Sequence, residues 1–157
     1  MIDKLKNTSH SPLDLIVVVG MYDLNLKFEP GRESILVNKI HIHPDWKSLD
    51  VVLDADIALI ELERAVHFSD FIQPICLWRG NADPSMMSGI VVGYGNNEVN
   101  IPHVTDVPIL TNEKCFRKKP DLSKFSSPRT FCGGVGVCSC DAGSGLFIKI
   151  NGVYHLR

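Results

Sequence analysis

Residues 145–154 read GLFIKINGVY, and this stretch carries the strongest signal for how the chain folds. Two short apolar runs flank Asn151-Gly152. Asn-Gly is the commonest pair in two-residue hairpin turns, because both central positions of such a turn require a positive φ. The stretch therefore predicts two short antiparallel strands joined at Asn151-Gly152.

Strand signals also dominate the rest of the chain. β-branched runs and alternation of apolar with polar residues predict further strands at 15–19, 34–43, 56–62, 90–92 and 104–110. Pro108 marks an edge strand or a bend, since proline cannot donate to a ladder. One helix is expected, at 111–119, with Thr111 as its candidate N-cap. The pattern is that of an all-β barrel or sandwich.

The composition fits one globular domain, or part of a larger one. Of 157 residues, 45% are hydrophobic and 22% charged, and 16 basic against 18 acidic side chains leave a formal net charge of −2. Such a chain offers no broad basic face to nucleic acid or anionic membrane. Its apolar runs fall far short of the roughly 20 residues that cross a bilayer. A polar, proline-containing stretch at 79–88 is the expected link between two halves, 1–78 and 89–157.

The N-terminus and the cysteine count bear on export. The first residues, MIDKLKNTS, lack the apolar core of a secretory signal. Asn7 begins a glycosylation acceptor triplet, which is weak support for export because so short a pattern often arises by chance. The chain has five cysteines, an odd number, so at least one is expected to be free or to pair outside residues 1–157.

Five local patterns occur in a fixed order. They are HIHPDW at 41–46, DADIAL at 54–59, IQPICL at 72–77, VGYG at 92–95, and FC at 131–132 followed by CSCDAGSG at 138–145. Together they resemble the trypsin/chymotrypsin-type serine proteases across nearly the whole chain, and most closely the arthropod modular or clip-type proteases of extracellular cascades. The resemblance implies a double antiparallel Greek-key β-barrel with one short helix, incomplete here. Open barrels expose unpaired edges, so marginal stability is expected.

The family chemistry uses a nucleophilic hydroxyl, an imidazole base, a buried carboxylate that orients the base, and backbone donors for the oxyanion. Asp56 matches the orienting carboxylate. The family segment Ala-Ala-His-Cys is absent from residues 1–157, and the neighbours of His10 do not match it. His41 and His43 are expected as ordinary strand-end histidines. With Asp54 or Asp56 they would lack further zinc ligands at a suitable spacing, so no metal site is predicted.

The nucleophile and oxyanion positions both depart from the family. Ala142 stands where the family has serine, and alanine cannot attack a carbonyl. Ser144 and Ser139 lie two residues beyond and three residues before that position, and neither is expected to replace the nucleophile. Cys140 replaces the glycine whose N–H is an oxyanion donor, and a free or mispaired thiol is expected there rather than a nucleophile, because no base is placed beside it.

The resemblance also implies a substrate pocket and an activation acid. Gly136 stands at the pocket floor, where relatives that cleave after Lys or Arg carry Asp, and Val137 lies beside it. The pocket is therefore expected to suit apolar or small side chains. Asp141 matches the acid that pairs with the ammonium group released by zymogen cleavage. The chain does not begin with Ile-Val-Gly-Gly, so this switch is not expected to operate.

By the same resemblance, the cysteines divide into one pair and several unpaired thiols. Cys115 and Cys132 match a disulfide that closes the loop after the helix. Cys76 matches the cysteine that tethers an upstream regulatory segment, and Cys138 matches one whose partner lies further along the chain.

These expectations combine into one function. The chain is predicted to be a secreted, non-catalytic serine protease homologue without a cofactor, which binds a protease, a protease substrate or an inhibitor in an extracellular cascade. The alternative is a fragment or altered form of an active secreted serine endopeptidase.

Overall fold

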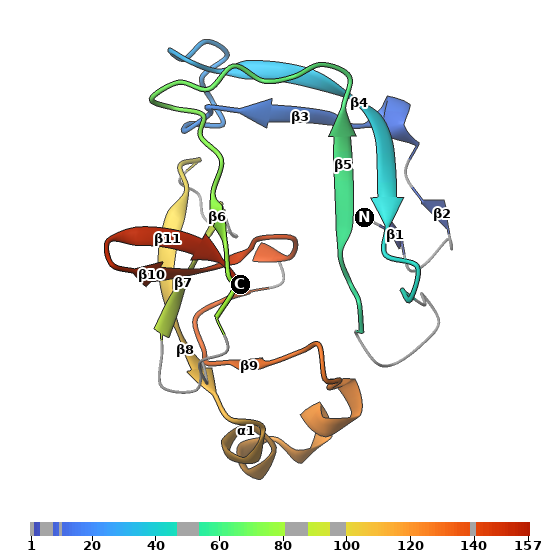
Figure 1. The fold of residues 1–157 in the computed structure, drawn as a ribbon, viewed down its shortest axis with the longest axis vertical. Coiled ribbons are helices and arrows are strands. Elements are labelled where there is room, and N and C mark those ends of the chain that lie inside the picture. The colour runs from blue at the N-terminus through green and yellow to red at the C-terminus, as the bar shows by residue number, and fades with distance from the viewer. Residues whose placement is uncertain are drawn as a thin grey trace. The chain divides into compact units, whose positions relative to one another are not determined.

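The computed structural model describes residues 2–3, 8–9, 11–46, 54–80, 88–94, 100–138 and 141–157 (Figure 1). The chain divides into two compact units that interleave along the sequence. The β4 unit comprises Met1–Met21, Glu29–Ile72 and Asp121–Thr130, and the β7 unit comprises Tyr22–Phe28, Gln73–Pro120 and Phe131–Arg157. Each unit is described by itself. The division expected from sequence, 1–78, 79–88 and 89–157, stays a prediction.

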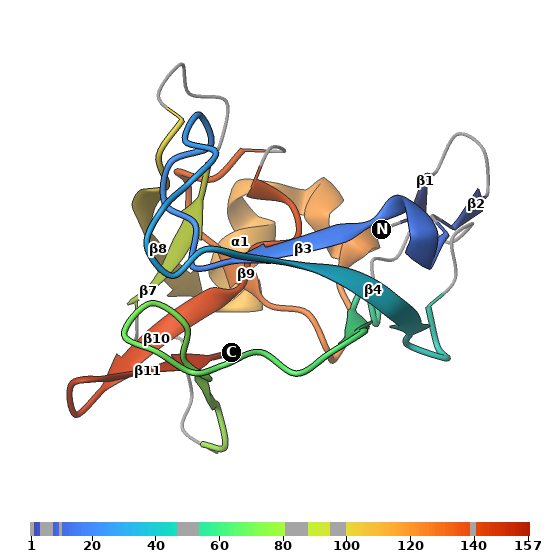
Figure 2. The same ribbon diagram turned by 90° about the horizontal axis from the view of Figure 1, so that it is seen from above.

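The β4 unit is built on a three-stranded antiparallel sheet in the order β3-β4-β5. Its strands are β3 (Ile16–Val19), β4 (Glu33–Ile42) and β5 (Ala58–Leu62). Val17 faces Ile35, and β3 and β4 run side by side (Figure 2). A short pair, β1 (Ile2–Asp3) and β2 (Thr8–Ser9), precedes them, and the 3₁₀ helix η1 (Pro12–Asp14) begins at a Ser11 capping box.

One face of this sheet is buried and the other is exposed. Ile35 and Val37 are 2% and 5% exposed, whereas Leu36 between them is 52% exposed. β5 is an edge of the described sheet, and its neighbouring residues Leu59 and Ile60 are both largely exposed. Because successive side chains of a strand point to opposite faces, β5 leaves apolar surface on both of its sides. The exposed edges and apolar faces expected from sequence are therefore present in the described part of the chain.

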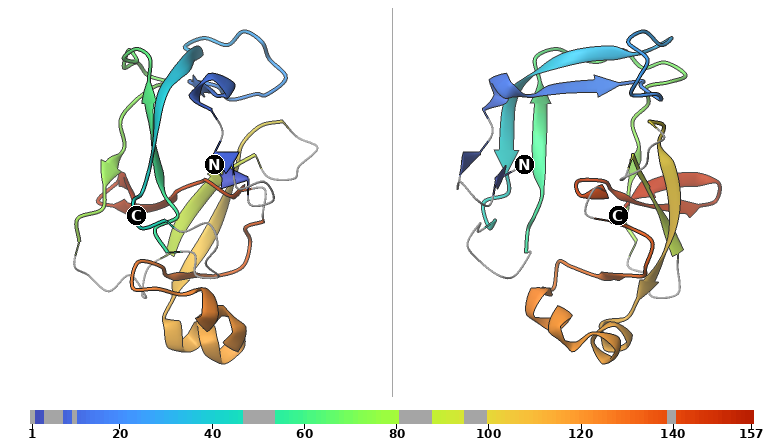
Figure 3. Two further views of the ribbon diagram at one scale, coloured as in Figure 1. Left: turned by 90° about the vertical axis from the view of Figure 1, so that its right-hand side faces the viewer. Right: turned by 180° about the vertical axis from the view of Figure 1, so that it is seen from behind.

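The β7 unit is built on a six-stranded sheet in the order β6-β11-β10-β7-β8-β9. Its strands are β6 (Cys76–Leu77), β7 (Ser88–Gly93), β8 (His103–Leu110), β9 (Cys132–Gly133), β10 (Leu146–Ile150) and β11 (Val153–Leu156). All the pairs are antiparallel except β6 with β11. The β10–β11 hairpin turns at Asn151 and Gly152, with φ of 49° and 85° (Figure 3). The hairpin expected from residues 145–154 is confirmed.

The core of the β7 unit comes from alternate positions of β8 and β10. Val107, Ile109, Leu146 and Ile148 form the buried cluster, and Trp78, Val91 and Ile150 pack against it. β7 lies between β8 and β10. It carries Gly89 at a position where the side chain of Leu146 from β10 occupies the space that a Cβ would take. A Cβ on Gly89 would lie 2.8 Å from Cδ1 of Leu146, so a side chain there would displace the core leucine.

The expected strands and helix are found within one or two residues of their expected bounds, and the all-β class is confirmed. Pro108 does not lie on an edge strand, because β8 pairs with both β7 and β9, and the alternative expectation of a bend stays a prediction. Pro108 lies opposite Ser88, at the end of the β7–β8 ladder, where its missing N–H costs little. Among the described residues, none of the helices is long and apolar enough to span a bilayer.

The helix α1 (Asn112–Lys118) joins the sheet to a disulfide. The hydroxyl of Thr111 accepts the N–H of Lys114 at 3.2 Å, which confirms Thr111 as the N-cap. Cys115, buried on the inner side of the helix, is bonded to Cys132 at the start of β9. The pair closes the loop that contains the 3₁₀ helix η3 (Pro120–Phe125). The disulfide implied by the resemblance is confirmed.

Removing this disulfide is expected to cost stability, because the unfolded chain regains the entropy of an open loop. For a sequence separation of 17 residues the loop-entropy relation gives about 3 kcal/mol. Urea unfolding of the double variant Cys115→Ala/Cys132→Ala checks this value. Cys76→Ala, which removes an exposed free thiol, is the control and should change little. A double variant as stable as that control contradicts the prediction.

Candidate active site

Asp56 lies at the centre of a tight turn that leads into β5. The N–H of Ile57 donates to the carbonyl of Ala55 at 2.8 Å, and the carbonyl of Ile57 accepts the N–H of His43 at 3.1 Å. Ala55 is buried with φ of 54°, a left-handed conformation that is uncommon for alanine. Asp56 is exposed in the β4 unit rather than buried, because none of the described residues of that unit covers it. Its assignment as the triad carboxylate stays a prediction.

Asp54, two residues before Asp56, belongs to an ion-pair cluster centred on Arg129. The guanidinium of Arg129 donates from Nε to Asp54 Oδ1 at 3.0 Å, from Nη2 to Asp54 Oδ2, and from Nη1 to Asp45 Oδ2 at 2.6 Å. The hydroxyl of Ser127 donates to Asp54 Oδ1 at 2.6 Å. These hydrogen bonds, Arg129 first and Ser127 second, lower the pKa of Asp54 to about 2. The cluster ties residues 121–130 to the turn before β5.

The lowered pKa of Asp54 makes the cluster sensitive to acid. The folded state favours the carboxylate, so its contribution to stability is present above the ordinary pKa of 3.8 and is lost as the pH falls toward about 2. Wild type is expected to be more stable than Asp54→Asn at neutral pH, with the difference shrinking through this window. Thermal unfolding of both proteins at a series of pH values tests it. Parallel stability curves contradict the prediction.

The histidines of the HIHPDW pattern have local partners. His41 Nε2 lies 2.9 Å from Glu61 Oε2 across the β4–β5 ladder, and Nδ1 of His43 accepts the N–H of Asp45 at 3.1 Å. In the described part of the chain, no group of three potential metal ligands comes together. The structure therefore places both histidines at a strand end, as the sequence indicated.

In the β7 unit, Asp141 is a buried acid with one oxygen hydrogen-bonded and the other beside an imidazole. It is 7% exposed, and Oδ2 accepts the N–H of Cys138 at 3.0 Å. This backbone hydrogen bond is the main reason that the pKa of Asp141 is lowered. Oδ1 lies 3.7 Å from Nε2 of His103, beyond hydrogen-bond distance, and has no hydrogen-bond partner among the described residues. The lowered pKa favours the carboxylate form of Asp141, and its Oδ1 faces the imidazole of His103.

Gly93 of the VGYG pattern provides the space for this carboxylate. A Cβ on Gly93 would lie 2.4 Å from Asp141 Oδ1 and 3.3 Å from the hydroxyl oxygen of Ser144. Real Cβ atoms do not approach other heavy atoms so closely, so one partner would have to move. The VGYG and CSCDAGSG patterns are therefore linked, because Asp141 of the second needs a residue without a Cβ at position 93 of the first.

Gly93→Ala is expected to destabilise the β7 unit by about 1–3 kcal/mol through overpacking against Asp141. The same substitution in an Asp141→Ala background should cost less, because the clashing carboxylate is gone. A double-mutant cycle measured by urea unfolding isolates this coupling. An equal cost in both backgrounds contradicts the steric explanation.

Ala142 occupies an exposed β-turn directly after Asp141. The N–H of Ser144 donates to the carbonyl of Asp141 at 3.0 Å, and Gly143 at the third position of the turn has φ of 95°. A positive φ at this position favours glycine. The assignment of Ala142 to the nucleophile position of the family stays a prediction. Cys140 and Ser139 lie outside the described residues, as does His10.

The expected pocket residues are exposed. Gly136 adopts φ of 121°, and a Cβ there would lie 2.7 Å from Cγ2 of Thr105, so both conformation and space favour glycine at this position. Val137 beside it is 45% exposed. The pocket function of these two residues stays a prediction.

Comparison with known proteins identifies the fold family. The Trypsin family model matches residues 8–154. The chain belongs to the trypsin family. Serine protease gd of Drosophila melanogaster is 32% identical over 189 aligned residues, which cover 98% of this chain and 36% of that protein. Complement C1s subcomponent of Rattus norvegicus is 28% identical over 151 aligned residues, covering 84% of this chain and 22% of that protein. The chain thus spans about a third of the length of Serine protease gd and about a fifth of the length of Complement C1s subcomponent.

The structure groups the trypsin-family positions into two sets. Asp56 belongs to the β4 unit beside the Arg129 cluster, whereas Asp141, Ala142, Gly136 and Val137 belong to the β7 unit. Two acids have partners that no sequence pattern indicates: Arg129 for Asp54, and His103 for Asp141. Nothing in the sequence marks Arg129, because it lies 75 residues from Asp54. His103 is equally unmarked, since it faces Asp141 only through the β7–β8 pairing that places it opposite Gly93.

Proposed function

We propose that this trypsin-family chain has no peptidase activity and acts by binding a protein of an extracellular proteolytic cascade. The observation that carries the proposal is Ala142 in the turn after the buried Asp141. In related chemistry, loss of the nucleophilic serine costs about 10⁶ in turnover, and what remains comes from binding and the oxyanion hole. A catalytic role for this turn is therefore unfavourable.

Two further departures support the absence of activity. Cys140 replaces the glycine whose N–H is an oxyanion donor, and loss of one such donor costs about 10²–10³ in rate. Residues 1–157 also contain no Ala-Ala-His-Cys segment to provide the base. Each departure affects a different component of the mechanism, so a single substitution does not repair it.

The binding role and the extracellular location rest on the cysteines and on the relatives. A disulfide between Cys115 and Cys132 favours an oxidising compartment. Cys76 and Cys138 are exposed thiols in the β7 unit, suited to pair with segments outside residues 1–157. We assign Cys76 to an upstream regulatory segment. The partner is then a protease, a protease substrate or an inhibitor, in keeping with the protease names of the relatives.

An altered form of an active serine endopeptidase is the second candidate. It is favoured by the lengths of the relatives, since residues missing from this chain could supply a base. It still requires a serine at position 142. A parent transcript with a serine codon there and an upstream Ala-Ala-His-Cys exon would support this candidate over the first.

The decisive test is labelling with a fluorophosphonate probe, beside trypsin as the positive control and with circular dichroism to confirm folding. No labelling is expected, because residue 142 has no hydroxyl. Ala142→Ser is expected to leave hydrolysis of a chromogenic peptide undetectable, because the base and the oxyanion glycine are still missing. Labelling of the folded wild type would falsify the proposal.

The binding role has its own measurement. Purified Serine protease gd is assayed with a protein substrate and with a small chromogenic peptide, each with and without this chain. A chain that holds the protein substrate slows only the first reaction, whereas one that blocks the protease slows both. If neither rate changes, a binding role toward this protease and substrate is excluded.

A further inference from the structure

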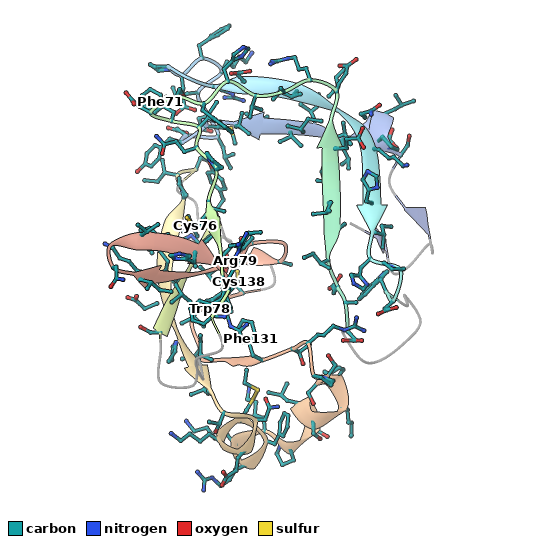
Figure 4. The ribbon with its side chains drawn as sticks, viewed as in Figure 1. Phe71, Cys76, Trp78, Arg79, Phe131 and Cys138 are labelled. Atoms are coloured by element: carbon teal, nitrogen blue, oxygen red, sulfur yellow. A yellow bond between two sulfur atoms is a disulfide. The ribbon has the colours of Figure 1, made fainter. Side chains whose placement is uncertain are left out.

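One cation of the β7 unit lies against two aromatic rings. Cζ of Arg157 lies 5.8 Å from the ring centroid of Trp78 and 5.3 Å from that of Phe131. Both aromatic residues belong to the β7 unit, and Figure 4 labels their side chains. Distances below about 6 Å are those of cation–π contacts, and arginine makes them more often than lysine.

The two rings come from opposite edges of the six-stranded sheet. Trp78 follows β6, the strand at one edge, and Phe131 precedes β9, the strand at the other. Each edge strand is only two residues long and pairs with one neighbour. Arg157 therefore contacts both ends of the sheet, where few ladder hydrogen bonds are available.

The backbone fixes the positions of these residues independently of the guanidinium. The N–H of Trp78 donates to the carbonyl of Leu156 at 2.8 Å, and the N–H of Arg157 donates to that of Leu146 at 2.9 Å. Phe131 precedes Cys132, which is held by the disulfide and by its pairing with Leu110. The rings are therefore anchored by bonds that do not involve the arginine side chain.

The chemistry of the site selects a guanidinium rather than any cation. Among the described residues, no Asp or Glu side chain forms an ion pair with Arg157, so the rings provide the recognition. A planar, weakly hydrated guanidinium stacks on aromatic faces, whereas an ammonium is compact and strongly hydrated. Phe131 is 39% exposed, so the site is open to solvent.

We propose that Trp78 and Phe131 form a guanidinium-binding site, and that Arg157 fills it and so joins the two edges of the sheet. The ligand class is the guanidinium group, which Arg157 presents to both rings. The site uses none of the residues assigned to catalysis in the trypsin family.

Chemical rescue tests the site. In a Trp46→Phe background, which leaves Trp78 as the fluorescent residue, Arg157→Ala is titrated with methylguanidinium at concentrations well below denaturing ones. Saturable change in Trp78 fluorescence is expected, with methylammonium binding several-fold more weakly. Wild type with Arg157 in place should show no saturable change. Replacing Phe131 by Leu in the Arg157→Ala protein should abolish the response.

Arg79→Ala provides the matched control, because Arg79 is an exposed arginine directly beside Trp78 in the chain. It should behave as wild type. Where Arg157→Ala does not fold by circular dichroism, Arg157→Lys is used, and a response between those expected for wild type and the alanine variant supports the site. A folded variant at position 157 that shows no saturable response, or an equal response from Arg79→Ala, overturns the proposal.

Discussion

The β7 unit depends on a strand that leaves space where a side chain would ordinarily stand. Gly89 and Gly93 lie on the same face of β7, four residues apart, with Val91 between them. Leu146 of the core fills the space above the first glycine, and the carboxylate of Asp141 fills the space above the second. The hydrophobic core and the buried acid are thus positioned by one strand face that carries only a single side chain.

This arrangement explains why sequence patterns far apart in the chain occur together. The VGYG pattern and the CSCDAGSG pattern meet at Gly93 and Asp141, about 50 residues apart. This chain has both Gly93 and Asp141, and the residue that follows Asp141 is Ala142. The contacts that position Asp141 come from Gly93 and from the N–H of Cys138, so none of them requires a hydroxyl at position 142.

The sequence predicted most of the strands, the hairpin and the helix, because these follow from short-range patterns. Thr111 and Asn151-Gly152 specify their cap and turn without help from distant residues. The long-range contacts could not be predicted in this way. Arg129 meets Asp54 only after folding. Whether Asp56 is buried or exposed depends on which distant residues cover it, not on its neighbours in the chain. The local signal at Pro108 does not separate an edge strand from the end of one ladder, because proline lacks an N–H to donate in either place.

The Arg129 cluster also bears on the order in which the chain can fold during synthesis. The β4 unit includes residues 121–130, which emerge from the ribosome after all of β7 and β8, while the β7 unit includes residues 22–28 from far upstream. Neither unit can therefore be complete when only the first half of the chain has been synthesised. The turn before β5 lacks its ion-pair partner until an arginine some 75 residues later than Asp54 has been made, and Leu59 and Ile60 of β5 expose apolar surface meanwhile. A nascent chain of this kind is expected to need chaperone protection until its last third is made.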